Sequence, residues 1–347
     1  MNGRIGMVVN PHAGRGERAV ADVVRRVLER VPATDLVLLG GTIEASIAAD
    51  LGLPHTTIAG SGTPCRAPVA ATQLLDAGAE ILIGIGGDGT LCDIATALVF
   101  GGSTACLLGI GVGSANVGPL ITMPGAWADR LELGDLRPSP VHGIEARVAG
   151  AAIGTAFNDV AFSNSFFGTR DGRRIDLDAA AALDGVDRPI LPASVCGRDA
   201  WISKNGRRLV SGERDAVAQI IASPINEPAS FAGKAISGLM CWGPYVGNHG
   251  ILAAASTVMI RTQLGAEDVA HAEPLRLTHI SFGADDEIGI GGLCAGAVVV
   301  LDGNPTRRLD EHGVVNLRLR TDAVRVLRLE SERPDSLPPA GERKGEV

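Results

Sequence analysis

The chain has 347 residues, 46% of them hydrophobic and 20% charged, with a formal net charge of −8 at pH 7. This composition is typical of a soluble globular protein that is large enough for two domains. The acidic balance, an aromatic content of only 3% and the absence of a long lysine or arginine run argue against nucleic acid as a partner.

The first 130 residues alternate between apolar runs and stretches with helical spacing of apolar residues. The predicted strands are 4–9, 36–39, 55–59, 80–85 and 105–110, and the predicted helices are 17–31, 42–51, 67–77 and 90–100. Such alternation predicts an α/β domain over residues 1–138 with a mostly parallel sheet, in which ligands bind at the carboxyl ends of the strands.

Glycine-rich loops follow three of these strands, at residues 10–16, 86–89 and 111–116. Glycine exposes backbone N–H groups and lets a bulky anion approach closely, and a helix that starts after the loop adds its positive dipole end. We therefore expect a phosphate-binding site where the loops meet. The residues expected to bind the phosphorylated cofactor are Asn10, Gly14, Gly16, Gly86, Gly87, Gly89, Thr90, Gly113, Ser114 and Asn116.

Asp88 is the one charge in the second loop. A carboxylate repels phosphate, so Asp88 either takes part in the chemistry or merely stabilises the turn and caps the helix. Gly84, Gly86 and Gly89 also spell the dinucleotide-binding fingerprint, but that motif needs an acidic residue about 20 positions later, and residues 94–128 carry no charge. No P-loop motif occurs anywhere in the sequence.

The uncharged stretch 94–128 is long enough to span a bilayer, but its glycines and two prolines favour buried α/β core, and we expect no membrane association. The six cysteines are scattered, with no C-x-x-C pair, which is typical of reduced thiols in a cytoplasmic protein. The N-terminus has no signal-peptide core.

Two prolines within residues 135–141 indicate a boundary, and the segment 139–330 is then predicted to be a β-rich domain, followed by a flexible tail at 331–347. Its predicted strands are 143–148, 154–162, 200–203, 216–222, 275–282, 297–301, 314–319 and 324–329. Asn158 and Asp159 interrupt an apolar run, which indicates either a binding role or a turn. The acidic cluster 285–287 is more typical of a solvated loop than of a Mg²⁺ site.

The sequence Gly-Gly-Asp-Gly-Thr at 86–90, after an apolar strand, resembles the signature of the superfamily that joins NAD kinases, diacylglycerol and sphingosine kinases, and 6-phosphofructokinases. The loop Asn-Pro-x-Ala-Gly-x-Gly at 10–16 is similar to the N-terminal loop of lipid kinases. The pattern is most similar to the AcoX-type branch associated with acetoin catabolism, most clearly over residues 5–165.

The resemblance implies an ATP-dependent kinase that uses Mg²⁺ held mainly by the phosphates, without metal ligands from the chain itself. Asp88 would be the base for the acceptor hydroxyl, and Asn158 and Asp159 match an Asn-Glu pair that holds the acceptor. Gly247 and Asn248 lie in a loop that loosely matches a substrate-closing loop. The acceptor would be NAD or a related nucleotide or small molecule, and the protein a homo-oligomer, a dimer or tetramer. The alternatives are a diacylglycerol-type lipid kinase and a nucleotide-binding protein without turnover.

Overall fold

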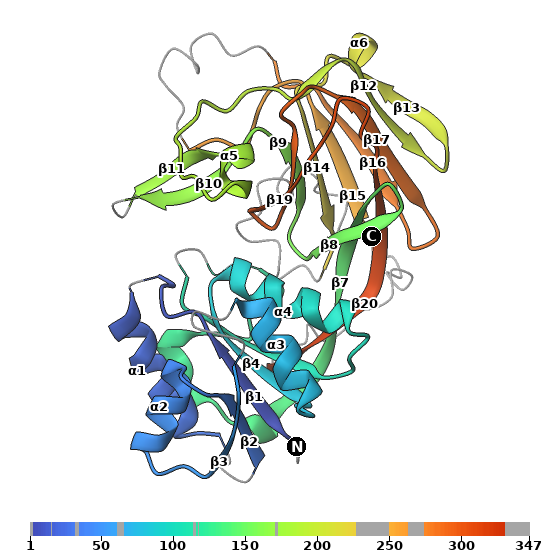
Figure 1. The fold of residues 1–347 in the computed structure, drawn as a ribbon. Helices are drawn as coiled ribbons and strands as arrows, with labels where there is room; N and C mark the ends of the chain where they lie inside the picture. Colours follow the sequence, from blue (N-terminus) through green and yellow to red (C-terminus); the bar gives the residue numbers. More distant parts are fainter. Residues whose placement is uncertain are drawn as a thin grey trace, which may run out of the picture.

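The computed structural model describes residues 3–14, 16–31, 35–60, 66–113, 116, 118–170, 173–226, 250–262 and 274–329. The chain forms an α/β half, which contains the N-terminus, and a second half built almost entirely of strands (Figure 1). The structure confirms both parts of the predicted fold class.

The α/β half is a parallel sheet with helices on both faces (Figure 1). Its strands run in the order β5-β4-β1-β2-β3, and every strand pairs with its neighbour in parallel. The strands are β1 (Ile5–Val9), β2 (Leu36–Leu39), β3 (His55–Ile58), β4 (Ile81–Gly86) and β5 (Cys106–Gly111), and the helices are α1 (Glu17–Leu28), α2 (Ile43–Asp50), α3 (Ala67–Asp76) and α4 (Asp88–Phe100).

Successive side chains of a strand point to opposite faces of the sheet, and the sequence supplies apolar residues for both. On β1, Met7 packs in a core cluster with α1 and α2, whereas the adjacent Val8 packs in a second cluster with α3 and α4. Because the sheet is buried on both sides, its strands are continuous apolar runs. Because the strands are parallel, their carboxyl ends, where the loops lie, share one edge of the sheet.

The second half contains a six-stranded antiparallel sheet with the order β16-β15-β14-β9-β18-β19. A second layer contains β13, β12, β17, β20, β7 and β8, and one apolar core fills the space between the two layers. The remaining elements are β6 (Met123–Pro124), β7 (Leu136–Val148), β8 (Ala151–Ala156), β9 (Val160–Ser163), β10 (Ser165–Arg170), β11 (Arg173–Asp178), α5 (Ala179–Leu183), β12 (Cys196–Lys204), β13 (Arg207–Ser211), α6 (Gly212–Asp215), β14 (Gln219–Pro224), β15 (Gly250–Ala255), β16 (Leu277–Phe282), β17 (Glu287–Leu293), β18 (Val298–Leu301), β19 (Asn304–Arg308) and β20 (Val315–Leu329).

The long strand β20 connects the two halves (Figure 1). It pairs antiparallel with β7 along most of its length and parallel with β5 near its end, where Arg325 lies opposite Cys106. The sequence predicted two strands, 314–319 and 324–329. The structure has one, with an irregularity between Arg320 and Val324 and a left-handed residue, Asp322, inside it.

The predicted strand 154–162 is wrong in one respect, because it is divided into β8 and β9 by a turn at residues 157–159. The backbone N–H groups of this turn donate to the side chain of Asp302 instead of to a neighbouring strand. The hairpin of β10 and β11 was not predicted. Among the described residues, no helix is both long and apolar enough to cross a membrane.

Candidate functional site

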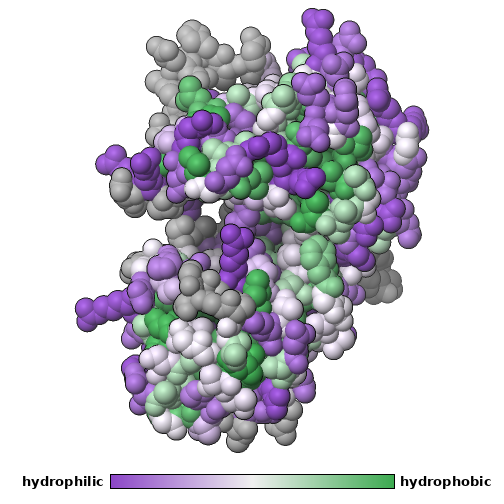
Figure 2. Space-filling view, viewed as in Figure 1, coloured by the Kyte–Doolittle hydropathy of each residue, from purple (hydrophilic) through white to green (hydrophobic). Residues whose placement is uncertain are grey.

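A cavity of about 620 Å³ lies between the two halves. The space-filling view shows the surface hollowed between them (Figure 2). From the α/β half the cavity is lined by the glycine loops and the start of α4, and from the β-rich half by the turn at 157–159, the hairpin β10–β11 and the turn between β18 and β19. The three predicted loops therefore meet at one cavity.

Gly87 and the first turn of α4, with Asp88, Gly89 and Thr90, line the cavity from the α/β side. Helix α4 begins at Asp88, two residues earlier than predicted, because the N–H of Leu91 already donates to the carbonyl of Gly87 at 3.1 Å. No side chain caps the helix from Gly87. The N–H groups of the first turn, which have no acceptor within the helix, and the positive end of the helix dipole therefore lie at the cavity edge.

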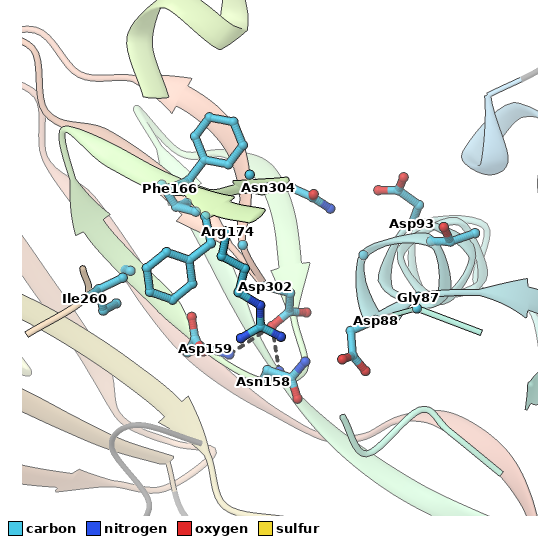
Figure 3. A pocket seen from close by; sticks show the side chains of 18 of the residues that line it. Gly87, Asp88, Asp93, Asn158, Asp159, Phe166, Arg174, Ile260, Asp302 and Asn304 are labelled. Atoms are coloured by element: carbon cyan, nitrogen blue, oxygen red, sulfur yellow. Dashed lines mark hydrogen bonds between the residues drawn. The ribbon is translucent and has the colours of Figure 1, made fainter. Parts of the chain in front are cut away.

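Asp88 does not point into the protein interior (Figure 3). Its Oδ1 accepts a hydrogen bond from the backbone N–H of Gly118 at 2.9 Å, which fixes the orientation of the carboxylate. Asn158 lies close by on the other side, since a Cβ atom added to Gly118 would be 2.7 Å from Asp88 Oδ1 and 2.9 Å from Asn158 Nδ2. A carboxylate from one half and an amide from the other thus meet at the cavity.

The first loop packs directly against the second. The side-chain amide of Asn10 donates to Thr90 Oγ1 at 3.0 Å, and Asn10 N–H donates to the carbonyl of Ile85 at 2.9 Å. Gly14 lines the cavity in a left-handed conformation, and a Cβ there would lie 1.8 Å from the carbonyl oxygen of Val112. Only glycine fits this position without moving the third loop.

The third loop contacts the second through its backbone. A Cβ on Gly113 would lie 2.7 Å from the Cα of Gly87, so position 113 needs glycine for this approach. Asn116 has a positive φ of 53°, and its amide donates to the carbonyl of Gly113 at 2.8 Å. The Oδ1 atoms of Asn116 and Asn158 are buried and have no hydrogen-bond partner within the described residues, which is uncommon for buried polar atoms in folded proteins.

Asp302 holds the turn that carries Asn158 and Asp159. Its Oδ1 accepts from the N–H groups of Asn158 and Asp159 at 2.6 and 2.9 Å, and its Oδ2 accepts from Phe157 N–H at 2.7 Å and from Cys92 Sγ at 2.6 Å. Burial raises the pKa of Asp302, against the effect of these four donors. The turn between β18 and β19 thereby positions the β8–β9 turn and contacts α4 at the same time.

Several lining residues are not among the predicted site residues. They are Ala13, Asp93, Ala161, Ser163, Ser165, Phe166, Phe167, Gly168, Arg174, Ile260, Val300, Asp302, Gly303 and Asn304. Figure 3 shows Asp88 and Asp93 on one side and Phe166 and Arg174 on the other. The pairs Phe166-Phe167 and Arg173-Arg174 are visible in the sequence, but nothing in their spacing connects them with the glycine loops.

Two carboxylates, those of Asp88 and Asp93, line the cavity from the α/β side. Burial, helped by the nearby carboxylate of Asp302 and opposed by Arg66, raises the pKa of Asp93 to about 6. Burial also raises the pKa of the Cys92 thiol well above its ordinary value. Among the described residues, no three His, Cys, Asp or Glu side chains are grouped so that they could hold a metal ion.

The remaining predicted site residues do not line the cavity or cannot be placed. Gly16 is the N-cap of α1, and Gly86 ends β4 with its Cα facing the side chain of Thr90, so both support the loops from outside the lining. Ser114, Gly247 and Asn248 lie outside the described residues. In the acidic cluster, Asp286 pairs with Lys204 at 2.8 Å and Glu287 pairs with Arg318 at 2.6 Å, which accounts for both residues structurally.

No protein-family model matches the chain. It is 31% identical over 329 residues to an uncharacterized protein of Archaeoglobus fulgidus, and the match spans 94% of this chain and 98% of the archaeal protein. The chain belongs to the family of this archaeal protein. The match spans both halves of the chain and not the α/β half alone.

Solved structures with the same fold include yeast NADH kinase complexed with NADH, with a TM-score of 0.55, 12% identity, and coverage of 95% of this chain and 84% of that one. A diacylglycerol kinase from Bacillus anthracis str. Sterne has a TM-score of 0.51 and 12% identity, over 94% of this chain and 97% of that one. The chain therefore has the fold shared by NAD kinase-like and diacylglycerol kinase-like proteins, as the glycine motif predicted.

Proposed function

We propose that this protein is a kinase that transfers the γ-phosphoryl group of ATP to a hydroxyl of NAD or a related nucleotide. The observation that carries the proposal is the meeting of Asp88 and Asn158 at the amino end of α4. This arrangement offers a carboxylate for the hydroxyl proton, an amide for the hydroxyl oxygen, and helix N–H groups for the phosphates, all at one place.

The loop chemistry fits a phosphate chain. Gly87, Gly89 and Gly113 place backbone N–H groups and no side chains at the cavity edge, where the dipole of α4 favours negative charge. The carboxylates of Asp88 and Asp93 would oppose an unaccompanied triphosphate, so ATP is expected to enter as its Mg²⁺ complex. The metal would be held mainly by the phosphates and would offset their charge.

The transfer step follows from the position of Asp88. The acceptor hydroxyl oxygen forms a bond to the γ-phosphorus while the bond from that phosphorus to the bridging oxygen breaks, and ADP leaves with the electron pair. The hydroxyl proton passes to the Asp88 carboxylate, whose orientation is set by Gly118 N–H. Asn158 and Asp159, held by Asp302, orient the acceptor from the β-rich half.

NAD is the proposed acceptor because the fold neighbour with the higher TM-score of the two is an NADH kinase seen with NADH. We further propose that the protein is of the AcoX type and that it assembles as a homo-oligomer. Light scattering on the purified chain tests the assembly separately from the activity. A monomer would refute that part alone.

The proposal is tested with Asp88→Asn. Loss of a positioned general base typically lowers the rate about 10²–10⁴-fold, so we expect that reduction in transfer of radiolabelled γ-phosphate to NAD. Binding of MgATP, measured by calorimetry, should persist. Asp93→Asn is the matched control, because it removes the same charge from the same helix at the same cavity and should retain activity within about tenfold.

A fully active Asp88→Asn variant refutes the assignment of the base. A wild-type protein that binds MgATP but phosphorylates nothing would instead support the nucleotide-binding protein without turnover. Diacylglycerol is included in the same assay, since Phe166, Phe167 and Ile260 form an apolar wall that an acyl chain would also fit. Transfer to diacylglycerol in preference to NAD would favour the lipid kinase.

A further inference from the structure

The hairpin β10–β11 places one arginine at the cavity and its sequence neighbour elsewhere. Arg174 lines the cavity, whereas Arg173, one position earlier on β11, does not. Successive side chains of a strand alternate between its faces, which explains the difference. In Figure 3 the guanidinium of Arg174 extends from the hairpin into the cavity, on the side of Asn158 and Asp159.

Arg174 is the single cationic side chain among the described residues that line this cavity. The carboxylates of Asp88, Asp93, Asp159 and Asp302 line it as well. Within the part of the chain that the structure describes, the Arg174 guanidinium has no carboxylate within ion-pair distance and no hydrogen-bond acceptor. A planar guanidinium with five donors in a fixed fork is suited to a carboxylate or phosphate group.

Apolar and aromatic side chains line the cavity together with Arg174. Phe166 and Phe167 come from the facing strand β10, and Ile260 approaches from the segment after β15. Phe167 is 45% exposed, although large apolar side chains are usually buried in a well-packed half of this kind. An exposed ring next to a cation provides a surface for a flat or apolar part of a ligand whose charged end reaches the guanidinium.

We propose that Arg174 binds an anionic group, a phosphate or a carboxylate, of the acceptor molecule, and that the ring or apolar part of the acceptor lies on the exposed ring of Phe167. The inference rests on the proposed function, in which the acceptor hydroxyl reaches Asp88. The triphosphate of ATP lies against the glycine loops on the α/β side, so the opposite anion site on the hairpin belongs to the other substrate. The acceptor is therefore an anionic hydroxyl compound and not a neutral lipid.

The test measures binding by calorimetry with the full chain and with two matched ligand pairs. AMP and adenosine differ by a phosphate, and 3-phenyllactate and its amide differ by a carboxylate, so the pairs distinguish the two sources of negative charge. We expect the wild type to bind at least one anion about 10- to 100-fold more tightly than its neutral counterpart, as charge-assisted hydrogen bonds to a guanidinium imply.

Arg174→Gln should abolish that preference, Arg174→Lys should restore part of it, and the control Arg173→Gln should keep it in full. The proposal is overturned if the wild type shows no preference for either anion, or if Arg174→Gln keeps it. It is also overturned if Arg174→Gln weakens the binding of MgATP as much as the binding of the anions, because the guanidinium would then bind the phosphoryl donor. No phosphoryl transfer is measured, so the result can be read even where the kinase proposal fails.

Discussion

The two sides of the cavity are built in different ways. The α/β side presents the backbone N–H groups of glycines from three loops and the amino end of a helix, and it adds a few polar side chains such as Asp88 and Asp93. The β-rich side is made mainly of side chains from places far apart in the sequence, among them the 157–159 turn, the hairpin β10–β11, Ile260 and the β18–β19 turn. A backbone-built surface suits the common chemistry of phosphate, and a side-chain-built surface can be varied to select the acceptor.

This difference predicts that the β-rich side depends on Asp302 for its shape. Asp302→Asn keeps the left-handed conformation that the residue adopts at φ 50°, but it places an NH₂ group opposite N–H and S–H donors. Buried donors without acceptors should lower the free energy of unfolding by about 2–4 kcal/mol, measured by urea denaturation. The exposed Asp322, also at a positive φ, gives the control Asp322→Asn, for which little change is expected.

If Asp302→Asn proves as stable as the wild type, the carboxylate does not organise the turn, and the proposed positioning of Asn158 fails with it. If the variant is less stable but binds MgATP with unchanged affinity, the contrast between the two sides is sharpened, because only the acceptor side has then been disturbed.

On the backbone-built side, two glycines should respond differently to the same added methyl group. Gly87→Ala meets nothing closer than the Cα of Gly113 at 3.4 Å, so the fold should survive while the methyl occupies the phosphate site. We expect MgATP affinity to fall about 10- to 100-fold, the equivalent of 1–3 kcal/mol of overpacking. Gly14→Ala would clash with the Val112 carbonyl and should lower stability as well. Unchanged MgATP affinity in Gly87→Ala would remove this loop from the phosphate site.

The smallest effect concerns Asp93, whose pKa burial raises to about 6 from an ordinary value of 3.8. The stability associated with its neutral form is complete below pH 4 and is lost as the pH rises through 6. Asp93→Asn stays neutral, so its stability relative to the wild type should rise by about 1–2 kcal/mol between pH 4 and pH 7. A difference that stays flat over this range would contradict the buried position of the carboxylate.

Glu44 gives a comparison outside the cavity. It is buried in the first turn of α2, and burial raises its pKa to about 7. The stability of Glu44→Gln relative to the wild type should therefore also rise with pH, over a higher pH range than for Asp93→Asn. MgATP binding should not change. A loss of MgATP binding in this variant would show that the helix layer, and not only the loops, controls the site.

The difference between the two sides of the cavity also explains which site residues could be predicted from the sequence. The glycine loops are local, since a strand, its loop and the next helix lie within about 20 residues, so Gly87, Asp88 and Gly113 could be found from their order alone. Asp302 and Phe157 lie 145 residues apart in the sequence, and only the sheet topology brings them together. Arg174 could not be found because an exposed arginine in a hairpin has no periodic signature. The sequence showed that Asn158 and Asp159 interrupt an apolar run, but it did not show that Asp302 holds this turn.

The most direct measurement is a crystal structure of the full chain with Mg²⁺ and a non-hydrolysable ATP analogue. We expect the γ-phosphate at the N–H groups of Gly87 and Gly89, beside the Asp88 carboxylate and across the cavity from Arg174. A nucleotide bound elsewhere, for example in the groove between α1 and the Gly111–Gly113 backbone, or a γ-phosphate on the Arg174 side of the cavity, would contradict it.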